Sequence, residues 1–308
     1  MRRALAPWPA AQSAPSRPRG ILLEALRVSD SSYAPLSRRI FLGIVLFALV
    51  GWTGCVPPRP PPPPLSRDVV IELVRAQSGT FRSVKDGDIA LNITTTEDGK
   101  VRSLPSLGGG IGFNAELPGL YLVATKVTKT IFTLRARGQQ FWLALPRTNE
   151  LVIGGPPAYA KLPWLIRPDE VQGFFADPEW LGLTWAGTTM TVEEDNYRFD
   201  IFTAGILRRQ VLVGRRLVVL RSVRRYDALQ RLETEIDLAD YELSDGALFP
   251  RRLTVDRPLN GVKVELELSD PKLNVDFPAK TFLPPDLPGW KVIDLDHEPI
   301  SAVKGFEE

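Results

Sequence analysis

Short strand-like segments follow one another along most of this chain, and the turns between them are brief. Residues 89–96 are rich in β-branched side chains and are followed by a turn at residues 97–100. Side chains of this kind favour a pleated sheet over a helix. Parallel neighbours would need connections of about a dozen residues or more, so the short turns predict antiparallel pairing. Further strands are expected at residues 120–126, 130–135, 140–145, 151–153, 190–194, 198–203, 210–213, 217–223, 232–241, 248–256 and 262–268.

Two segments depart from this strand pattern. Ser66 is a suitable N-cap for a helix that ends near Gln77 and whose apolar residues share one face. A second helix is expected at residues 168–177, where acidic side chains stand in the first turn. The order of helix, strands, helical insertion and strands predicts a mainly β (α+β) fold. We expect one strongly curved antiparallel sheet with helices against its concave side.

The sequence holds one cysteine, Cys55, and one histidine, His297. An intramolecular disulfide, a cysteine metal cluster and a zinc site built from several histidines are therefore excluded. A Ser-His-Asp or Cys-His pair would have to use His297, which lies between Asp296 and Glu298 and is expected to be solvated. We expect no metal, no cofactor and no enzymatic activity.

The formal charge of +2 is unevenly divided along the chain. Before Cys55, seven arginines stand against Glu24 and Asp30, a charge of +5, which leaves −3 for the remainder. Binding to nucleic acid needs clustered lysine and arginine side chains that replace condensed counterions. The remainder is therefore not expected to bind nucleic acid.

Residues 38–54 have the order of a secretory signal. Arg38 and Arg39 form its positive region, and residues 40–50 are apolar without a charge. This run is shorter than the roughly 20 residues that a transmembrane helix needs. The preceding residues 1–37 are interpreted as a disordered extension or as the product of a misassigned start codon.

The signal ends in Thr53-Gly54-Cys55, which resembles the lipobox of bacterial lipoproteins. The resemblance implies attachment of diacylglycerol to the Cys55 thiol, cleavage before that residue and acylation of the new amine, for example by palmitate. Trp52 departs from the pattern, because the family usually has leucine there. An uncleaved membrane anchor and a cleaved signal with a chance cysteine are the alternatives. The implied location is the bacterial envelope, lipid-anchored, at the outer membrane and facing the periplasm.

Residues 55–64 follow as a polyproline tether, with an unbroken run of proline at positions 60–64. Such a segment is extended at about 3.1 Å per residue and holds a folded domain away from a bilayer. A ligand for an aromatic-groove domain is the alternative reading of the prolines. The folded domain is expected at residues 65–295, and residues 296–308 are expected to form a polar tail.

Three stretches resemble the LolA/LolB-like superfamily of outer-membrane lipoprotein carriers and receptors. They are residues 120–125 leading to 131–134, residues 138–146 with an aromatic strand closed by proline, and residues 273–276 followed by 282–285. The resemblance implies an unclosed half β-barrel with a helical lid around an apolar cavity that holds acyl chains. No residue of the carrier or the receptor can be carried over, because no short motif matches one.

Large apolar side chains on the expected strands and on the helical insertion are the candidate lining of that cavity. They are Leu122, Phe132, Phe141, Trp142, Phe174, Phe175 and Trp180. Each of them fits an ordinary hydrophobic core equally well. Residues 108–112 are rich in glycine but do not open a helix after a strand, so no nucleotide site is expected there. The loop before them, with Leu104 and Leu107, is interpreted as a flexible turn, and exposed apolar contacts with a membrane are the alternative.

Three arginine pairs, 208–209, 215–216 and 224–225, flank expected strands. They fit acidic lipid headgroups and also charges that protect strand edges from aggregation.

The leading hypothesis is a membrane-anchored envelope lipoprotein that binds lipid or lipoprotein acyl chains, with a role in lipoprotein sorting or outer-membrane maintenance. A protein-interaction or sensor module on the same fold, whose partner is another envelope protein, is the alternative. A hydrolase using His297 or a carboxylate pair is the third reading.

Overall fold

The computed structural model describes residues 62–244 and 246–303. The signal at residues 38–54, Cys55 and most of the polyproline tether lie outside the described residues. The described residues belong to the compact unit Pro60–Glu308, which is called the body below. No helix in the described part of the chain is long and apolar enough to cross a membrane.

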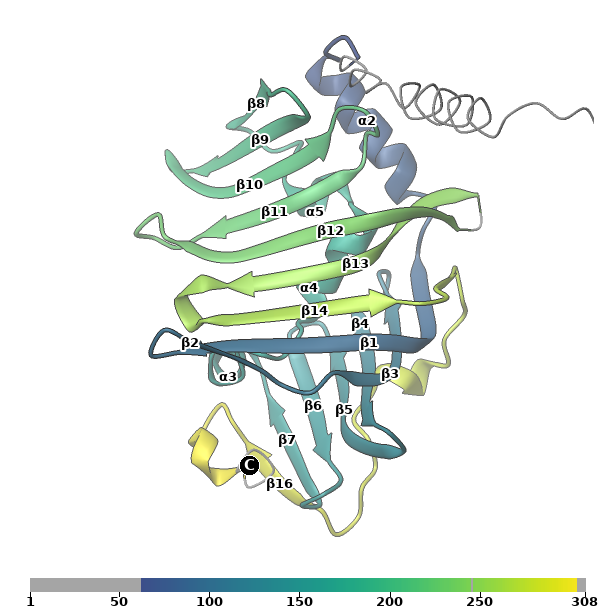
Figure 1. Ribbon diagram of the computed structural model, residues 1–308, viewed down its shortest axis with the longest axis vertical. Helices are drawn as coiled ribbons and strands as arrows, with labels where there is room; N and C mark the ends of the chain where they lie inside the picture. Colours follow the sequence, from purple (N-terminus) through teal and green to yellow (C-terminus); the bar gives the residue numbers. More distant parts are fainter. Residues whose placement is uncertain (1–61, 245, 304–308) are drawn as a thin grey trace, which may run out of the picture. The chain divides into compact units, whose positions relative to one another are not determined.

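One large sheet of 16 strands forms the body, and it does not close into a barrel (Figure 1). Its path is β16-β7-β6-β5-β4-β3-β1-β14-β13-β12-β11-β10-β9-β8, and β2 and β15 pair with β1 beside that path. The strands before the helical insertion are β1 (Ser83–Glu97), β2 (Lys100–Ser103), β3 (Leu107–Asn114), β4 (Gly119–Lys126), β5 (Lys129–Arg137), β6 (Gln140–Leu145) and β7 (Glu150–Gly154). The strands after it are β8 (Thr188–Val192), β9 (Asn196–Thr203), β10 (Ile206–Gly214), β11 (Leu220–Tyr226), β12 (Leu232–Ser244), β13 (Ala247–Arg257), β14 (Val262–Leu268), β15 (Lys272–Leu273) and β16 (Lys291–Asp294). The expected curved, unclosed sheet is confirmed.

The expectation of purely antiparallel pairing fails at one edge of the sheet. Strand β16 pairs with β7 in parallel, with Lys291 opposite Glu150. The chain reaches β16 through residues 274–290, and a connection of this length lets a strand return in the parallel direction. The pairings elsewhere along the sheet are antiparallel.

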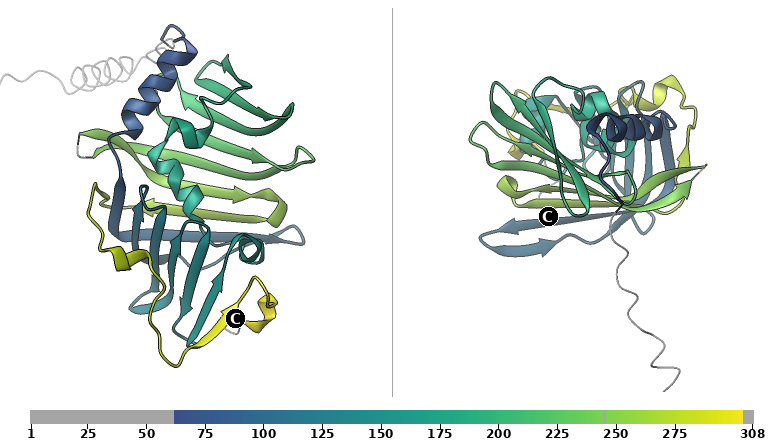
Figure 2. Two further views of the ribbon diagram at one scale, coloured as in Figure 1. Left: turned by 180° about the vertical axis from the view of Figure 1, so that it is seen from behind. Right: turned by 90° about the horizontal axis from the view of Figure 1, so that it is seen from above.

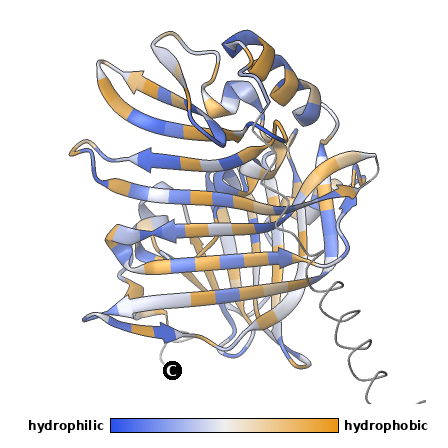
Figure 3. Cartoon of the chain, turned by 45° about the horizontal axis from the view of Figure 1, so that its top comes forward, coloured by the Kyte–Doolittle hydropathy of each residue, from blue (hydrophilic) through white to orange (hydrophobic). Residues whose placement is uncertain are grey.

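The longest strand, β1, joins the two halves of the sheet. It pairs with β3 on one side and with β14 on the other, where Ile93 lies opposite Val264. Alternation along the strands decides which face becomes the core. In β14 the residues Val262, Val264 and Leu266 are buried while their neighbours are more exposed, and Figure 3 shows the same alternation across the neighbouring strands. Strands of this kind therefore have one apolar face.

Helices lie against the concave face of the sheet (Figure 2). The first, α2 (Arg67–Ser78), follows the expected Ser66 N-cap and buries Val70, Ile71 and Val74. The others belong to the connection from β7 to β8, residues 155–187, which we call the cover segment. Its helices are α3 (Pro156–Lys161), α4 (Pro168–Val171), the 3₁₀ helix η1 (Gln172–Phe175) and α5 (Pro178–Leu181). Three further 3₁₀ turns are η2 (Pro258–Asn260), η3 (Ala279–Phe282) and η4 (Ile300–Ala302).

The single helix expected at residues 168–177 is instead α4 followed by η1. Ala176 adopts a left-handed conformation with φ of 49° and ends the helical segment. Gly173 lies close to the sheet, since a Cβ atom there would sit 3.7 Å from Ile236. The 3₁₀ turn of η1 is tighter than an α-helical turn, and it places Phe174 and Phe175 in the core, where both are buried.

The glycine-rich stretch at residues 108–112 is part of strand β3. Gly109 has a φ of 150°, and a Cβ atom there would lie 1.8 Å from the carbonyl oxygen of Val123. The register between β1 and β3 shifts between Asp86 and Ile89, opposite this glycine. Glycine is needed here because the neighbouring strand passes too close for a side chain.

Candidate functional site

Aromatic side chains of the concave face and of the cover segment pack directly against each other. Phe175 of η1 lies 5.1 Å from Phe113 of β3, centroid to centroid. Phe174 stacks on Phe249 of β13 at 5.4 Å. The sheet therefore meets its cover through offset and tilted ring contacts, the arrangement that aromatic pairs prefer.

Most of the predicted lining residues come together in this layer. Leu122, Phe132, Phe141, Phe174 and Phe175 are buried members of one hydrophobic cluster, and Trp180 of α5 packs against it half-buried. The cover segment also supplies ring partners, because Trp164 lies 5.6 Å from Phe132 and Tyr159 lies 4.9 Å from Phe141. Burial raises the pKa of the Tyr159 hydroxyl, and the nearby Asp169 carboxylate adds to this.

Trp142 lies apart from the other predicted lining residues. It follows Phe141 on β6, and successive side chains of a strand point to opposite faces. Phe141 is fully buried while Trp142 is half-buried. Its cross-strand neighbour on β5 is Arg135, whose guanidinium lies 5.7 Å from the ring of Tyr121. Trp142 therefore belongs to the outer face of the sheet.

A buried ion pair ties the cover segment to the sheet. The Nη2 atom of Arg257, the last residue of β13, lies 2.6 Å from both carboxylate oxygens of Glu170 in α4. Both side chains are almost completely buried, at 1% and 0% exposure. The same guanidinium donates to the carbonyl oxygens of Pro163 and Leu165. Arg257 thus holds three points of the cover segment at once.

A second set of contacts holds α4 and α5 against the concave face of the sheet. Arg225 of β11 forms an ion pair with Asp169, and Arg209 of β10 donates to the carbonyl oxygen of Trp180. The two guanidinium groups lie 5.6 Å and 5.5 Å from the centroid of the Trp180 ring. Cation–π contacts of this kind hold a tryptophan in place more strongly when the charge is partly desolvated.

The end of the polyproline tether is fixed to the body. Arg215 donates to the carbonyl oxygen of Pro62 at 2.6 Å, and the backbone amide of Leu65 donates to the hydroxyl of Tyr197 at 2.9 Å. These bonds hold the chain against strands β9 and β10 before α2 begins. Proline itself offers only its carbonyl for such a bond.

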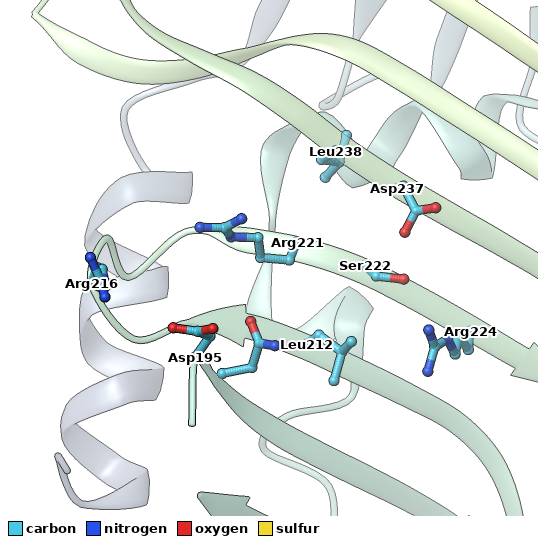
Figure 4. A pocket seen from close by; sticks show the side chains of 9 residues that line it. Asp195, Leu212, Arg216, Arg221, Ser222, Arg224, Asp237 and Leu238 are labelled. Carbon is cyan, nitrogen blue, oxygen red and sulfur yellow. The ribbon is translucent and has the colours of Figure 1, made fainter. Parts of the chain in front are cut away.

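The outer face carries a polar depression of about 640 Å³ near the end of strand β10 (Figure 4). Among the side chains around it, Ser222 and Asp237 lie opposite each other on β11 and β12. Burial raises the pKa of Asp237, and Glu235 adds to this. Arg224 at its edge donates to Glu235 at 2.6 Å. The depression is lined by Asp195, Asn196, Leu212, Arg216, Arg221, Ser222, Arg224, Asp237 and Leu238.

The only histidine of the sequence, His297, lies at the surface with 83% of its side chain exposed. Its Nδ1 atom is 2.8 Å from a carboxylate oxygen of Asp294. The next acidic residue, Asp296, accepts hydrogen bonds from the backbone amides of Gly155 and Ala158 at the start of α3. Within residues 62–244 and 246–303 no group of three or more His, Cys, Asp or Glu side chains could hold a metal ion.

Arg209 and Arg225 belong to two of the arginine pairs noted in the sequence, but Arg257 was not expected at the site, although strand parity could have found it. Arg257 has the same parity as Leu253 and Val255 on β13, so it points to the core. Arg209 likewise shares its parity with Val211 on β10. The partners of Arg257 could not have been read from the sequence, because Glu170 lies far from Arg257 along the chain.

No protein-family model and no curated protein matches this sequence, but solved structures match the body. A DUF1329 family protein from Desulfovibrio piger is 13% identical with a TM-score of 0.50, and the alignment covers 70% of this chain and 96% of that one. A LolA superfamily protein from Nitrosomonas europaea is 11% identical with a TM-score of 0.45, covering 71% of this chain and 98% of that one. At 13% identity the likeness to the DUF1329 family protein concerns the fold alone.

Proposed function

We propose that this protein is a lipid-anchored protein of the bacterial envelope that binds lipid or lipoprotein acyl chains between its sheet and its cover segment. The apolar concave face under a cover of short helices is the observation that carries the proposal. In this layer Phe132 of the sheet contacts Trp164 of the cover segment, and Phe174 of the cover segment contacts Phe249 of the sheet. An acyl chain gains roughly 0.8 kcal/mol for each buried methylene, so it needs little polar recognition to bind there.

Entry of a chain would require the cover segment to move. Short helices favour such a motion, since α4 and α5 span only four residues each and have little stability of their own. Their polar ties to Arg257, Arg225 and Arg209 keep the cover closed when no ligand is bound. Covers that open on binding and close over the ligand are a common way to sequester a bound molecule from water.

The first test is native mass spectrometry of the body, Pro60–Glu308, which forms a compact unit. We expect lipid to co-purify and to be released by organic extraction. Phe132→Ala should reduce the bound fraction several-fold, because it removes a ring that contacts the cover segment. Trp142→Ala is the matched control, since that ring lies on the outer face, and it should leave the bound fraction unchanged. An empty body in native spectra would contradict the proposal and favour the protein-interaction module.

The anchor is proposed at Cys55, with lipoprotein sorting or outer-membrane maintenance as the role. A tether of seven residues from Cys55 to Pro62 would span about 22 Å in the polyproline II conformation, and Pro62 is bonded to the body by Arg215. Cells labelled with radioactive palmitate should yield a labelled protein whose label is lost on Cys55→Ser. Label that persists in this variant would place the lipid elsewhere or remove it from the proposal.

A further inference from the structure

Two arginines face each other directly on the concave face. Arg209 of β10 lies opposite Arg225 of β11, and two residues further the register places Val211 opposite Val223. Both valines are fully buried, so the arginines belong to the core-facing side of the strands. Like charges in directly opposite positions destabilise a strand pair. An arrangement that costs stability within the fold is a candidate for a binding role.

The charge of this pair is only partly neutralised within the described residues. Asp169 forms an ion pair with Arg225, whose side chain is 19% exposed. Arg209 hydrogen-bonds to the carbonyl oxygen of Trp180 and to no carboxylate. Burial and the neighbouring Arg225 lower the pKa of Arg209 to about 10, although Asp169 opposes this. Two guanidinium cations thus share one carboxylate, and a surplus of one positive charge remains at neutral pH.

The surplus charge borders the apolar layer under the cover segment. The ring of Trp180, over which both guanidinium groups lie, packs against the hydrophobic cluster. The α5 helix that carries it lies against the concave side of the sheet (Figure 2). A ligand that reached both regions would need an anionic end and an apolar end.

We propose that Arg209 and Arg225 form a subsite for the anionic group of an amphiphile, a phosphate or a carboxylate, whose acyl chain lies under the cover segment. This inference rests on the proposed function and adds the chemical class of the ligand. Guanidinium groups bind phosphate and carboxylate through paired N–H donors. The anion takes the place of the Trp180 carbonyl at Arg209 and competes with Asp169 for Arg225. Binding of the anionic group therefore loosens the contact of Arg209 with α5 and the contact of Arg225 with α4.

The test compares three probes with the same palmitoyl chain and different ends. They are palmitate, palmitoyl lysophosphatidylglycerol and monopalmitoylglycerol, which carry a carboxylate, a phosphate and no charge. Their dissociation constants for the body are measured by calorimetry at low salt, below the concentrations at which the probes form micelles. We expect at least one anionic probe to bind about tenfold tighter than the neutral one, as a charged hydrogen bond contributes. The carboxylate and phosphate arms show which anion the subsite accepts.

The preference should depend on Arg209. Arg209→Gln should bring the affinities of the anionic and neutral probes close to parity, whatever the change in the affinity for the neutral probe. Arg224→Gln is the matched control, because Arg224 lies on the other face of β11 and pairs with Glu235; the preference should survive it. If Arg209→Gln fails to fold, salt serves as the second measurement with the unchanged protein. Added NaCl should weaken binding of the anionic probe and spare the neutral probe.

Equal binding of all three probes to the unchanged protein would overturn the subsite and leave the proposed function standing. A preference that persists in Arg209→Gln would also overturn it. Failure of all three probes to bind would overturn the proposed function together with the subsite.

Discussion

At the residue scale, the ion pair between Arg257 and Glu170 is the contact with the largest expected effect on stability. Glu170→Gln leaves the Arg257 guanidinium buried without its carboxylate. Breaking a buried pair on one side costs about 3–5 kcal/mol, and we expect a loss of stability of this order in urea unfolding of the body. The matched control is Glu72→Gln in α2, whose pair with Arg75 is exposed and should contribute at most about 1 kcal/mol. Equal losses of stability in the two variants would show that the Arg257–Glu170 pair stabilises the body no more than an exposed pair does.

The pair of His297 and Asp294 gives a prediction on pH dependence. The hydrogen bond to Asp294 and the negative charge of that carboxylate raise the pKa of His297. The hydrogen bond from His297 and the one from the backbone amide of Asp296 lower the pKa of Asp294. The stabilisation linked to His297 is complete below its unfolded pKa of about 6.5 and is lost as the pH rises through its higher folded value. The stabilisation linked to Asp294 is present above its unfolded pKa of about 3.9 and is lost as the pH falls through its lower folded value.

NMR titration can follow this residue directly, because the sequence contains one histidine. The imidazole should titrate above about 6.5 in the unchanged protein, and Asp294→Asn should bring the midpoint back to the ordinary value. An identical midpoint in both proteins would show that the carboxylate does not act on the ring.

At the scale of elements, strand β3 depends on a glycine that the close approach of β4 requires. Gly109→Ala would place a Cβ atom 1.8 Å from the carbonyl oxygen of Val123 and would strain a backbone with φ of 150°. We expect a loss of roughly 1–3 kcal/mol in unfolding free energy. Gly108→Ala is the matched control, since its nearest neighbour would be 3.7 Å away. Equal unfolding free energies of the two variants in chemical denaturation would contradict the close approach of β4 to Gly109.

The cover segment shows why element boundaries were harder to predict than element types. Acidic residues in the first turn marked the start of α4 correctly. The helical part ended at the left-handed Ala176, a residue that is not typical of such a position. Its conformation is set by tertiary context, which local propensity does not contain.

At the scale of the whole body, β1 couples the two halves of the sheet. Leu91 of this strand is buried and lies opposite Leu107 of β3 and Leu266 of β14. Leu91→Ala should cost about 2–5 kcal/mol. Because both halves share the strand, tryptophan fluorescence and far-ultraviolet circular dichroism should report one common transition before and after the change. Separate transitions for the two probes would show that the halves unfold independently.

The sequence by itself determined the curved sheet and several residues of its apolar layer. Those properties follow from local alternation and from turns too short for crossover connections, so they can be read from neighbouring residues. The predicted Phe132, Phe141 and Phe174 are buried for this reason, whereas Trp142 was misplaced because alternation within its own strand was not applied to it.

Only the tertiary structure decided which charges enter the core. The choice of Arg257 and Glu170 as partners, and the meeting of Arg209 with Arg225 over Trp180, depend on strand order and on the path of the cover segment. Charges are buried only where another part of the chain arrives to pair with them. That arrival is a property of the whole fold, and no local pattern in the sequence encodes it.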